Sequence, residues 1–364
     1  MKMYNTQNEK QKAFMVYVSF NTKEDVNTKI SELKSLIQAN NLDAVGNMVQ
    51  FKKEPDLSYL IGIGKLEELK AIIDSESIDL VVFQNSLSGS KINNLETYLG
   101  VKVIDRTMLI LDIFAQRATS NEGKLQVELA QLKYTLPRLS GLSGSSGRFG
   151  SGGVGMRGPG ETKLELDRRK IEKQIQIKQK EIKELEKNRE VRKRQRANSY
   201  YKTVSLVGYT NSGKSTLMNT LSKSDVFIKD MLFATLDTTT RKLYLNENLT
   251  VLLTDTVGFV SDLPHELVEA FKSTLEESVS SDLLIHVVDC SDPMSIQKEQ
   301  ITLDVLKSLN VDLNKIITVY NKMDKPHLFD PERLYISAKN NINLDKVREK
   351  IIEFFGAETK EDEY

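Results

Sequence analysis

The sequence of 364 residues contains one cysteine, Cys290, and three histidines. A single cysteine excludes an internal disulfide framework and suits a reducing compartment. No apolar run approaches the length that spans a membrane, and the first residues lack the apolar core of a secretion signal. We therefore expect a cytoplasmic protein without a membrane span.

Charge of one sign is not in excess, because 51 Lys and Arg residues balance 51 Asp and Glu residues. The balance hides an uneven distribution. Residues 1–140 contain 17 basic and 17 acidic residues, residues 141–200 contain 16 and 8, and residues 201–364 contain 18 and 26. A basic middle between a neutral and an acidic flank indicates a localised contact with a polyanion.

The clearest motif is Gly208-Tyr-Thr-Asn-Ser-Gly-Lys-Ser215, a complete phosphate-binding loop between a strand-like run and a helix-like run. Its glycines allow backbone N–H groups to surround a phosphate, and the helix N-terminus adds partial positive charge. We expect Lys214 to reach the β- and γ-phosphates as a catalytic residue, and the Ser215 hydroxyl to bind Mg²⁺. The loop residues expected to bind nucleotide are Gly208, Asn211, Ser212, Gly213, Lys214, Ser215 and Thr216.

Asp255-Thr-Val-Gly258 ends the strand-like run 250–254. We expect Asp255 to lie in the shell around Mg²⁺ and the Gly258 backbone N–H to contact the γ-phosphate during catalysis. A hydroxyl-rich segment, 233–241, precedes this motif. Within it we expect Thr235, with Thr238 as the alternative, to bind Mg²⁺ and the γ-phosphate in the triphosphate state.

Asn321-Lys-Met-Asp324 follows the apolar run 316–320 and is typical of a guanine-reading loop. An Asp carboxylate accepts hydrogen bonds from guanine N1–H and the exocyclic amine, which adenine does not offer at those positions. The later Ser337-Ala-Lys339 is expected to supply the backbone N–H that contacts guanine O6. These motifs, each at a strand end and in order, predict GTP binding. The base-side residues are Asn321, Lys322, Asp324, Ser337, Ala338 and Lys339.

The rest of the chain predicts an α/β fold with further parts. Alternating strand-like and helix-like runs indicate an N-terminal α/β domain over 1–106. The turn Gly62-Ile-Gly-Lys65 within it is interpreted as structural, with a phosphate contact as the alternative. A doubly wound, mostly parallel GTPase domain is expected over 200–356, and an acidic tail over 357–364.

A long antiparallel helical hairpin is predicted over 107–199. Residues 107–136 are helix-compatible apart from Gly123, and Pro137 ends that run. Residues 161–196 predict one long charged helix with an apolar seam that packs on 107–136. The seam residues are Leu164, Ile171, Ile175, Ile182 and Leu185.

The segment between the predicted hairpin helices, residues 140–160, contains nine glycines and cannot fold alone. It is either a passive linker or a finger that orders on RNA, using Arg148 and Arg157 for phosphate and Phe149 for base stacking. The basic cluster at the end of the long helix is either a solvated face or an RNA contact, which we favour. Its residues are Arg192, Lys193, Arg194 and Arg196.

Four stretches resemble signatures of the HflX family of translation-factor-class GTPases: Val103–Ala118, Gly158–Arg169, Phe233–Asp237 and Asp255–Val260. The resemblance implies GTP hydrolysis, binding to the large ribosomal subunit and its rRNA, and dissociation of stalled or idle 70S ribosomes. Many members of the family have a further small domain after the GTPase domain, whereas here 25 residues (340–364) follow Lys339.

Phe259 stands where many such GTPases have a glutamine that orients the attacking water. A phenyl ring cannot hold that water, so we expect slow intrinsic hydrolysis that the ribosome stimulates. Asn211 resembles the asparagine that coordinates K⁺ in GTPases with a hydrophobic residue at this position; its alternative role is to satisfy the loop backbone.

Three function classes remain open on the sequence: a ribosome-acting GTPase, which we favour and expect to be monomeric, an RNA-modification accessory that uses GTP as a timer, and an RNA-binding scaffold with GTP as a structural ligand. The second needs its own catalytic constellation, and the N-terminal half offers none, since all three histidines follow residue 260.

Overall fold

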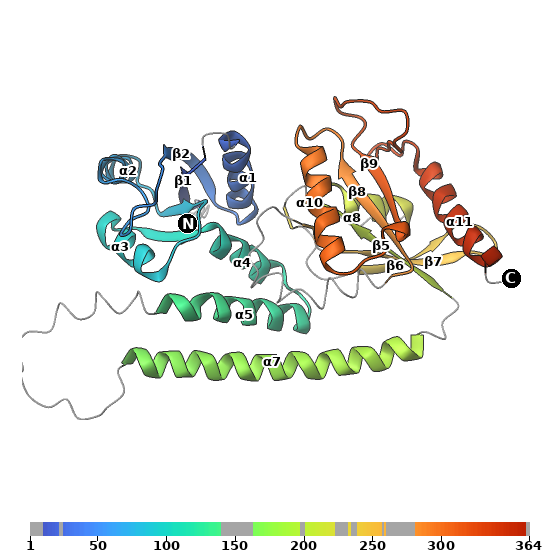
Figure 1. The fold of residues 1–364 in the computed structure, drawn as a ribbon, viewed down its shortest axis with the longest axis horizontal. Coiled ribbons are helices and arrows are strands. Elements are labelled where there is room, and N and C mark those ends of the chain that lie inside the picture. The colour runs from blue at the N-terminus through green and yellow to red at the C-terminus, as the bar shows by residue number, and fades with distance from the viewer. Residues whose placement is uncertain are drawn as a thin grey trace, which may run out of the picture. The chain divides into compact units, whose positions relative to one another are not determined.

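The computed structural model describes residues 10–21, 25–139, 163–196, 201–222, 232–233, 239–256, 258–259 and 281–361. The chain divides into two compact units, one built from residues 1–116 and 127–181 and the other from 117–126 and 182–364. The predicted α/β fold class is confirmed, with an N-terminal α/β part, a helical middle and a second, mostly parallel sheet in chain order (Figure 1). None of the helices in the described part of the chain is long and apolar enough to cross a membrane.

The first unit contains a parallel four-stranded sheet in the order β2-β1-β3-β4. Its strands are β1 (Lys12–Ser19), β2 (Asp43–Phe51), β3 (Leu80–Phe83) and β4 (Lys102–Asp105). The helices between and after them are α1 (Val26–Ala39), α2 (Ile63–Glu76), α3 (Gly89–Leu99) and α4 (Arg106–Arg117). Figure 1 shows α2 and α3 on one side of this sheet and α1 and α4 on the other. Helices on both faces explain why β3 is buried along its whole length.

The helical middle differs from the sequence prediction at one point. Residues 107–136 form two helices, α4 and α5 (Asn121–Thr135), rather than one. The Ser120 hydroxyl accepts a hydrogen bond from the Gly123 N–H at 2.9 Å, and its carbonyl accepts one from the Lys124 N–H at 3.1 Å. These bonds cap a new helix at Asn121. Gly123 therefore lies inside the first turn of α5 and does not interrupt it.

The buried carboxylate of Asp105 holds the C-terminal end of α5 in place. Asp105 accepts hydrogen bonds from the N–H groups of Leu87 and Met108, each at 3.0 Å, and from the Tyr134 hydroxyl. Burial, and then the adjacent Asp105 charge, raise the pKa of Tyr134 well above its ordinary value. The Arg138 guanidinium, in the short helix η1 (Leu136–Arg138), lies over the Tyr134 ring and donates to the Leu87 carbonyl at 3.0 Å. The end of α5 is thus tied to the connection between β3 and α3.

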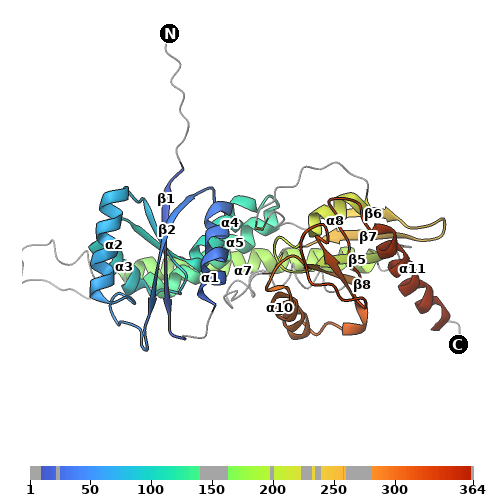
Figure 2. The ribbon, with the colours of Figure 1, turned by 90° about the horizontal axis from the view of Figure 1, so that it is seen from above.

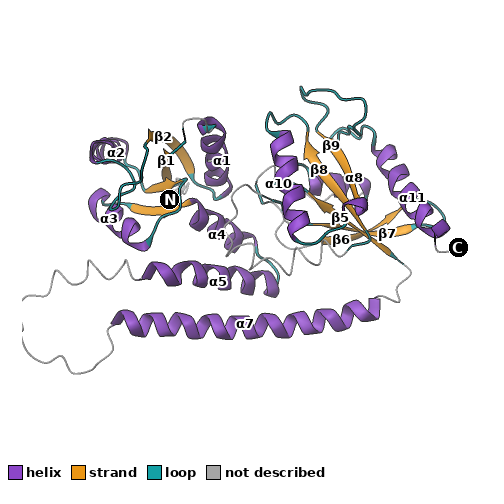
Figure 3. Cartoon of the chain, in the orientation of Figure 1, coloured by secondary structure: helices purple, strands orange, loops and turns teal. Residues whose placement is uncertain are grey.

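The long helix α7 (Lys163–Arg196) runs beside α5 in the opposite direction, as the hairpin prediction requires (Figures 1 and 3). Ile175 and Ile182 of the predicted seam are buried. Lys178 reaches Glu128 of α5 at 2.8 Å, but the two side chains remain 28% and 53% exposed. Because such exposed pairs contribute about 1 kcal/mol at most, we assign the pairing of α5 with α7 mainly to the apolar seam. The glycine-rich segment 140–160 lies outside the described residues.

The second unit contains a five-stranded sheet in the order β6-β7-β5-β8-β9. Its strands are β5 (Lys202–Val207), β6 (Thr239–Tyr244), β7 (Thr250–Asp255), β8 (Leu283–Asp289) and β9 (Ile316–Asn321). β6 pairs antiparallel with β7, and the other pairs are parallel. The described helices are α8 (Lys214–Leu221), α10 (Ser295–Ser308), η2 (Leu313–Lys315) and α11 (Leu344–Glu361). Seen from above, β5 and β8 lie between α8 and α10 (Figure 2).

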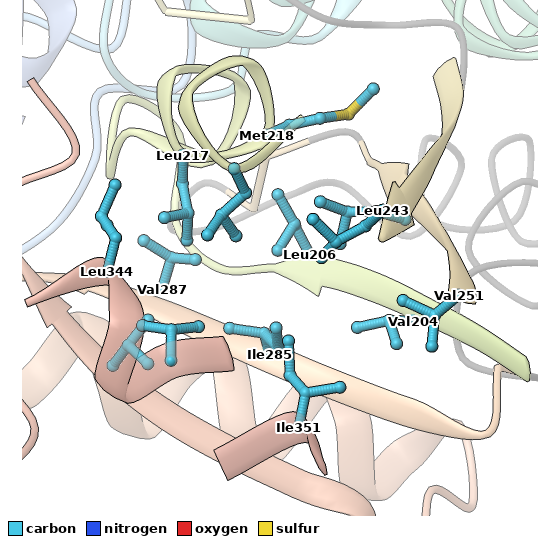
Figure 4. Packing of buried hydrophobic residues seen from close by; sticks show 14 of the residues in the cluster. Val204, Leu206, Leu217, Met218, Leu243, Val251, Ile285, Val287, Leu344 and Ile351 are labelled. Carbon is cyan, nitrogen blue, oxygen red and sulfur yellow. The ribbon is translucent and has the colours of Figure 1, made fainter. Parts of the chain in front are cut away.

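One apolar cluster holds α8 and α11 against the same face of this sheet (Figure 4). Leu206 of β5, Ile285 of β8, Leu217 of α8 and Ile351 of α11 are all fully buried in it. Since neighbouring parallel strands share one direction, their carboxyl ends and the loops that follow them lie at one edge of the sheet. α11 continues to Glu361, into the segment expected as an acidic tail.

Candidate nucleotide-binding site

The phosphate-binding motif connects the end of β5 to the start of α8 and is packed too tightly for side chains at its glycines. Gly208 and Gly213 have φ angles of +147° and +96°. A β-carbon on Gly208 would lie 2.3 Å from the Val287 carbonyl oxygen, and one on Gly213 would lie 2.2 Å from Nδ2 of Asn321. Both positions therefore require glycine. The loop is pressed against β8 on one side and against the end of β9 on the other.

Lys214 is the first residue of α8, and its side chain is held inside the phosphate loop. It is only 6% exposed, and Nζ donates to the carbonyl oxygens of Gly208 at 3.0 Å and Tyr209 at 2.9 Å. Removal from water lowers the pKa of Lys214 to about 8, while the nearby Asp255 carboxylate opposes that change. Because an ammonium has three N–H donors, the two carbonyl bonds leave one donor for a phosphate oxygen.

Two oxygen ligands suited to Mg²⁺ meet next to this lysine. The Ser215 hydroxyl donates to Oδ2 of Asp255 at 2.6 Å, and Oδ1 of Asp255 accepts from the Thr256 N–H at 3.0 Å. Hydroxyl and carboxylate oxygens are the donor atoms that Mg²⁺ prefers, so the residues present fit the metal. Thr235, the other predicted Mg²⁺ ligand, and its alternative Thr238 lie outside the described residues.

The segment after β7 is clamped to the phosphate loop by backbone hydrogen bonds. The Phe259 N–H donates to the Gly208 carbonyl at 3.1 Å, and the Phe259 carbonyl accepts from the Thr210 N–H at 2.6 Å. A β-carbon on Gly258 would lie 2.6 Å from Cα of Thr210 and 3.0 Å from Nζ of Lys214. Gly258 thus lies beside Lys214, and its contact with the γ-phosphate stays a prediction. The Phe259 ring is 2% exposed and packs inward.

Asn321 joins the base side of the site to the phosphate side. Its side chain is 3% exposed, Nδ2 donates to the Ser212 carbonyl at 2.9 Å, and Oδ1 accepts from the Ala338 N–H at 3.0 Å. One amide group therefore satisfies two buried backbone groups on different loops. The contact with Ser212 spans 109 positions of sequence.

Lys322 has a similar supporting contact. It has a positive φ of +67°, and Nζ donates to the Asn211 carbonyl at 2.8 Å. Nζ also lies 2.7 Å from Oδ2 of Asp289, at the end of β8. The sequence analysis did not select Asp289, although its place at the end of the apolar run 283–288 was a usable signal. The first two residues of Asn321-Lys-Met-Asp324 thus hold the phosphate loop in place.

Asp324 is the exposed member of this motif. Oδ1 accepts from the Ser337 hydroxyl at 2.6 Å, and this bond is the main reason why the pKa of Asp324 lies below its ordinary value. The Ser337 oxygen in turn accepts from the Asn340 N–H at 3.2 Å. Ser337 is fully buried and Lys339 is exposed. The site therefore offers an ionised, oriented acceptor for a base edge.

The remaining predicted residues are placed less tightly. Thr216 is half-buried in α8, and its carbonyl accepts from the Thr220 hydroxyl at 2.8 Å. Asn211 is exposed with a φ of +62°, and its side chain has no hydrogen-bond partner among the described residues. Both predicted roles of this side chain, coordination of K⁺ and satisfaction of the loop backbone, stay predictions. The Ser212 hydroxyl is buried without a partner in the same part of the chain.

The predicted RNA contacts are outside the described side chains. Arg148 and Arg157 fall within residues 140–162, which the structure does not describe. The basic cluster of Arg192, Lys193, Arg194 and Arg196 falls in the last turns of α7, where the structure gives the backbone only.

Comparisons with known proteins agree with this geometry. Residues 27–115 match a family model described as GTP-binding GTPase N-terminal, residues 117–196 match the GTP-binding GTPase middle region, and residues 203–322 match the family described as 50S ribosome-binding GTPase. A solved GTP-binding protein from the archaeon Sulfolobus solfataricus, in complex with GDP, is 25% identical with a TM-score of 0.53. That likeness covers 94% of this chain and 98% of the other.

Curated relatives match over most of their length. The GTPase HflX of Caldanaerobacter subterraneus is 49% identical over 346 residues, which cover 94% of this chain and 80% of the relative. The GTPase HflX of Escherichia coli is 36% identical over 367 residues, covering 98% and 85%. Because this likeness extends along nearly the whole chain, the protein belongs to the HflX family of GTPases and is a GTP-binding, GTP-hydrolysing enzyme.

Proposed function

We propose that this GTPase binds the large ribosomal subunit and its rRNA, dissociates stalled or idle 70S ribosomes in its GTP state, and leaves the subunit after hydrolysis. The observation that supports the proposal most is the match of residues 203–322 to a family described as 50S ribosome-binding. A second support is the Asn321 side chain, which hydrogen-bonds both the Ser212 carbonyl of the phosphate loop and the Ala338 N–H of the predicted base-side loop.

In this mechanism the chain's own residues bind and orient GTP. Lys214 donates its third N–H to the phosphates, the Gly258 N–H contacts the γ-phosphate, and Asp324 accepts from the guanine edge. Ser215 and Asp255, with Thr235 as the proposed third residue, would hold Mg²⁺, which supplies positive charge to the phosphate oxygens when bound.

The burial of Phe259 supports our proposal that intrinsic hydrolysis is slow. Its buried ring leaves no hydrogen-bonding side chain at the position that orients water in many related enzymes. The ribosome would supply the missing alignment. We also propose that K⁺ contributes positive charge next to the exposed Asn211 side chain. Replacement of K⁺ by Na⁺ should then slow hydrolysis in the wild type but not in Asn211→Ala, and equal wild-type rates in both salts would exclude the ion.

Co-sedimentation with purified ribosomal subunits, with GDP or a non-hydrolysable GTP analogue, tests the proposal directly. We expect the GTP analogue to favour binding to the large subunit, the large subunit to stimulate hydrolysis, and the wild type to convert 70S particles into subunits. Lys214→Ala should lose hydrolysis and serves as the inactive control. Hydrolysis that is indifferent to ribosomal subunits would instead favour an RNA-binding scaffold with GTP as a structural ligand.

The basic middle of the chain is proposed to contact rRNA. If the cluster Arg192, Lys193, Arg194 and Arg196 meets phosphates, changing all four to glutamine should flatten the salt dependence of subunit binding by up to about four units of slope. Deletion of residues 144–155 should impair particle splitting more than docking. Normal splitting by both variants would show that the basic middle of the chain is only a solvated spacer.

A further inference from the structure

Tyr209 carries the one aromatic ring of the phosphate loop, and its backbone holds the lysine of that loop. The Tyr209 carbonyl accepts hydrogen bonds from Nζ of Lys214 at 2.9 Å and from the Ser212 N–H at 3.2 Å. Tyr209 is 7% exposed, so these bonds are made away from bulk water. The position of the Tyr209 carbonyl therefore helps to decide where the Lys214 ammonium points.

A second lysine, Lys298 of α10, contacts the Tyr209 ring from outside the loop. Its Nζ lies 4.8 Å from the centroid of the ring, where the electrons of the aromatic face attract a cation. Nζ of Lys298 also lies 2.5 Å from Oδ2 of Asp292, whose Oδ1 accepts from the Met294 N–H at 2.9 Å. The Lys298 and Asp292 side chains are only 26% and 23% exposed. The ammonium of Lys298 is thus partly shielded from water and held by both a carboxylate and a ring.

The contact with Lys298 differs from the other side-chain contacts that support this loop. Asn321 and Lys322 donate to the carbonyls of Ser212 and Asn211, in the second half of the loop. Lys298 instead acts on the side chain of Tyr209, in the first half. Of these three supporting side chains, only Lys298 contacts a residue whose carbonyl binds Nζ of Lys214.

We propose that Lys298 is a positioning residue for GTP hydrolysis, which holds the Tyr209 ring and, through the Tyr209 carbonyl, keeps the Lys214 ammonium directed at the phosphates. The inference rests on the phosphate-binding role proposed above for Lys214. Orientation of the ammonium matters most for hydrolysis, because stabilisation of the charge that develops in the transition state depends on fixed geometry. GDP binding depends on it less, since a lysine ammonium is a compact charge on a flexible stem and attracts a phosphate from a range of positions.

Lys298→Met tests the proposal, because it keeps an unbranched apolar stem and removes the charge. A partly shielded contact between a cation and a ring corresponds to a factor of about five, so we expect kcat to fall by about that factor. GDP affinity should stay within about twofold. Lys298→Arg keeps a cation over the ring and should recover most of the wild-type kcat. Lys307→Met is the matched control, because Lys307 lies on the same helix, is 53% exposed and pairs with Asp304 at 3.9 Å; its replacement should leave kcat unchanged.

A double-mutant cycle with Tyr209→Leu tests whether the effect passes through the ring. If it does, Lys298→Met should lower kcat no further once the ring is gone. A fivefold fall in the Tyr209→Leu background as well would overturn the proposal, and so would wild-type kcat in Lys298→Met. An equal fall of kcat and GDP affinity would overturn it too, because Lys298 would then only shape the phosphate loop. Should Lys298→Met fail to fold, Lys298→Gln compared with Lys298→Arg gives the same contrast.

Lys214→Met tests the underlying role of Lys214 separately. Normal hydrolysis in Lys214→Met would refute the phosphate-binding role proposed for that residue. Wild-type kcat in Lys298→Met beside an inactive Lys214→Met would refute the role of Lys298 alone.

Discussion

Asp324→Asn should change the base preference from guanine toward xanthine, because Ser337 determines how the new side chain is turned. The Ser337 hydroxyl donates to Oδ1 of Asp324 at 2.6 Å. An asparagine keeps its oxygen toward that donor and places its NH₂ group where the second carboxylate oxygen was. The NH₂ group then faces the exocyclic amine of guanine, donor against donor. Xanthine has a carbonyl oxygen at that ring position and accepts the bond.

The magnitude follows from the groups involved. A hydrogen bond to a charged partner contributes about 1.5–3 kcal/mol, and an unpaired donor costs about 1–3 kcal/mol. Together they correspond to a loss of roughly 10²–10⁴ in GTP affinity, since about 1.4 kcal/mol is tenfold. Asp324 is exposed in this structure. Solvent competes with an exposed group, so we expect the lower end, about 10²-fold.

Competition of GTP and XTP against a fluorescent GDP measures the change. Asp304→Asn, on the exposed side of α10, removes the same charge and should leave both affinities unchanged. Adding Ser337→Ala to Asp324→Asn removes the donor that orients the amide, so the two nucleotides should come to bind within about tenfold of each other. An unchanged ratio of GTP to XTP affinity in Asp324→Asn would refute the guanine-reading role. An unchanged ratio on adding Ser337→Ala would refute the orienting role of the serine.

Packing and charge predict four further outcomes. GDP affinity should be constant up to about pH 8 and then fall by at most about tenfold per pH unit. The reason is that burial lowers the pKa of Lys214 to about 8, and the phosphates need the charged form of this side chain. Lys214→Met should show no such fall between pH 7 and 9. Gly89→Ala should lower the free energy of unfolding by about 3 kcal/mol or more in urea denaturation, because its β-carbon would lie 2.0 Å from the Arg138 carbonyl oxygen. Gly64→Ala meets nothing within 4 Å and should instead raise it by about 0.5–1 kcal/mol. Phe259→Gln should destabilise the fold without raising intrinsic hydrolysis, because the ring is buried; a tenfold faster single turnover would contradict this.

The regular elements could be predicted from the sequence because their hydrophobic patterns are local. The apolar run 80–83 is β3, and the long charged run predicted over 161–196 is α7 from Lys163 to Arg196. The break after α4 could not be predicted from the glycine, because two hydrogen bonds to Ser120 decide it. Apart from Gly123, the helix-compatible sequence continues across the break.

The candidate site residues could be named from motifs, whereas their mutual contacts could not. The bond from Asn321 to the Ser212 carbonyl joins residues 109 positions apart, and nothing local encodes such a pairing. Thr210 stands at an open position of its motif, so its bonds to Phe233 and Phe259 emerge only in three dimensions. The hydrogen bond from the Tyr134 hydroxyl to Asp105 could not be predicted from the sequence for the same reason.

The unequal use of the guanine-reading motif has an evolutionary consequence. The Asn321 and Lys322 side chains hydrogen-bond the Ser212 and Asn211 carbonyls of the phosphate loop, whereas Asp324 faces outward. We expect a substitution at either of the first two to weaken binding of every nucleotide, because both side chains support the phosphate loop. Asp324 can change while the phosphate cradle stays intact. We therefore expect a single substitution at Asp324 to change the base preference, whereas we expect phosphate binding to depend on several residues at once.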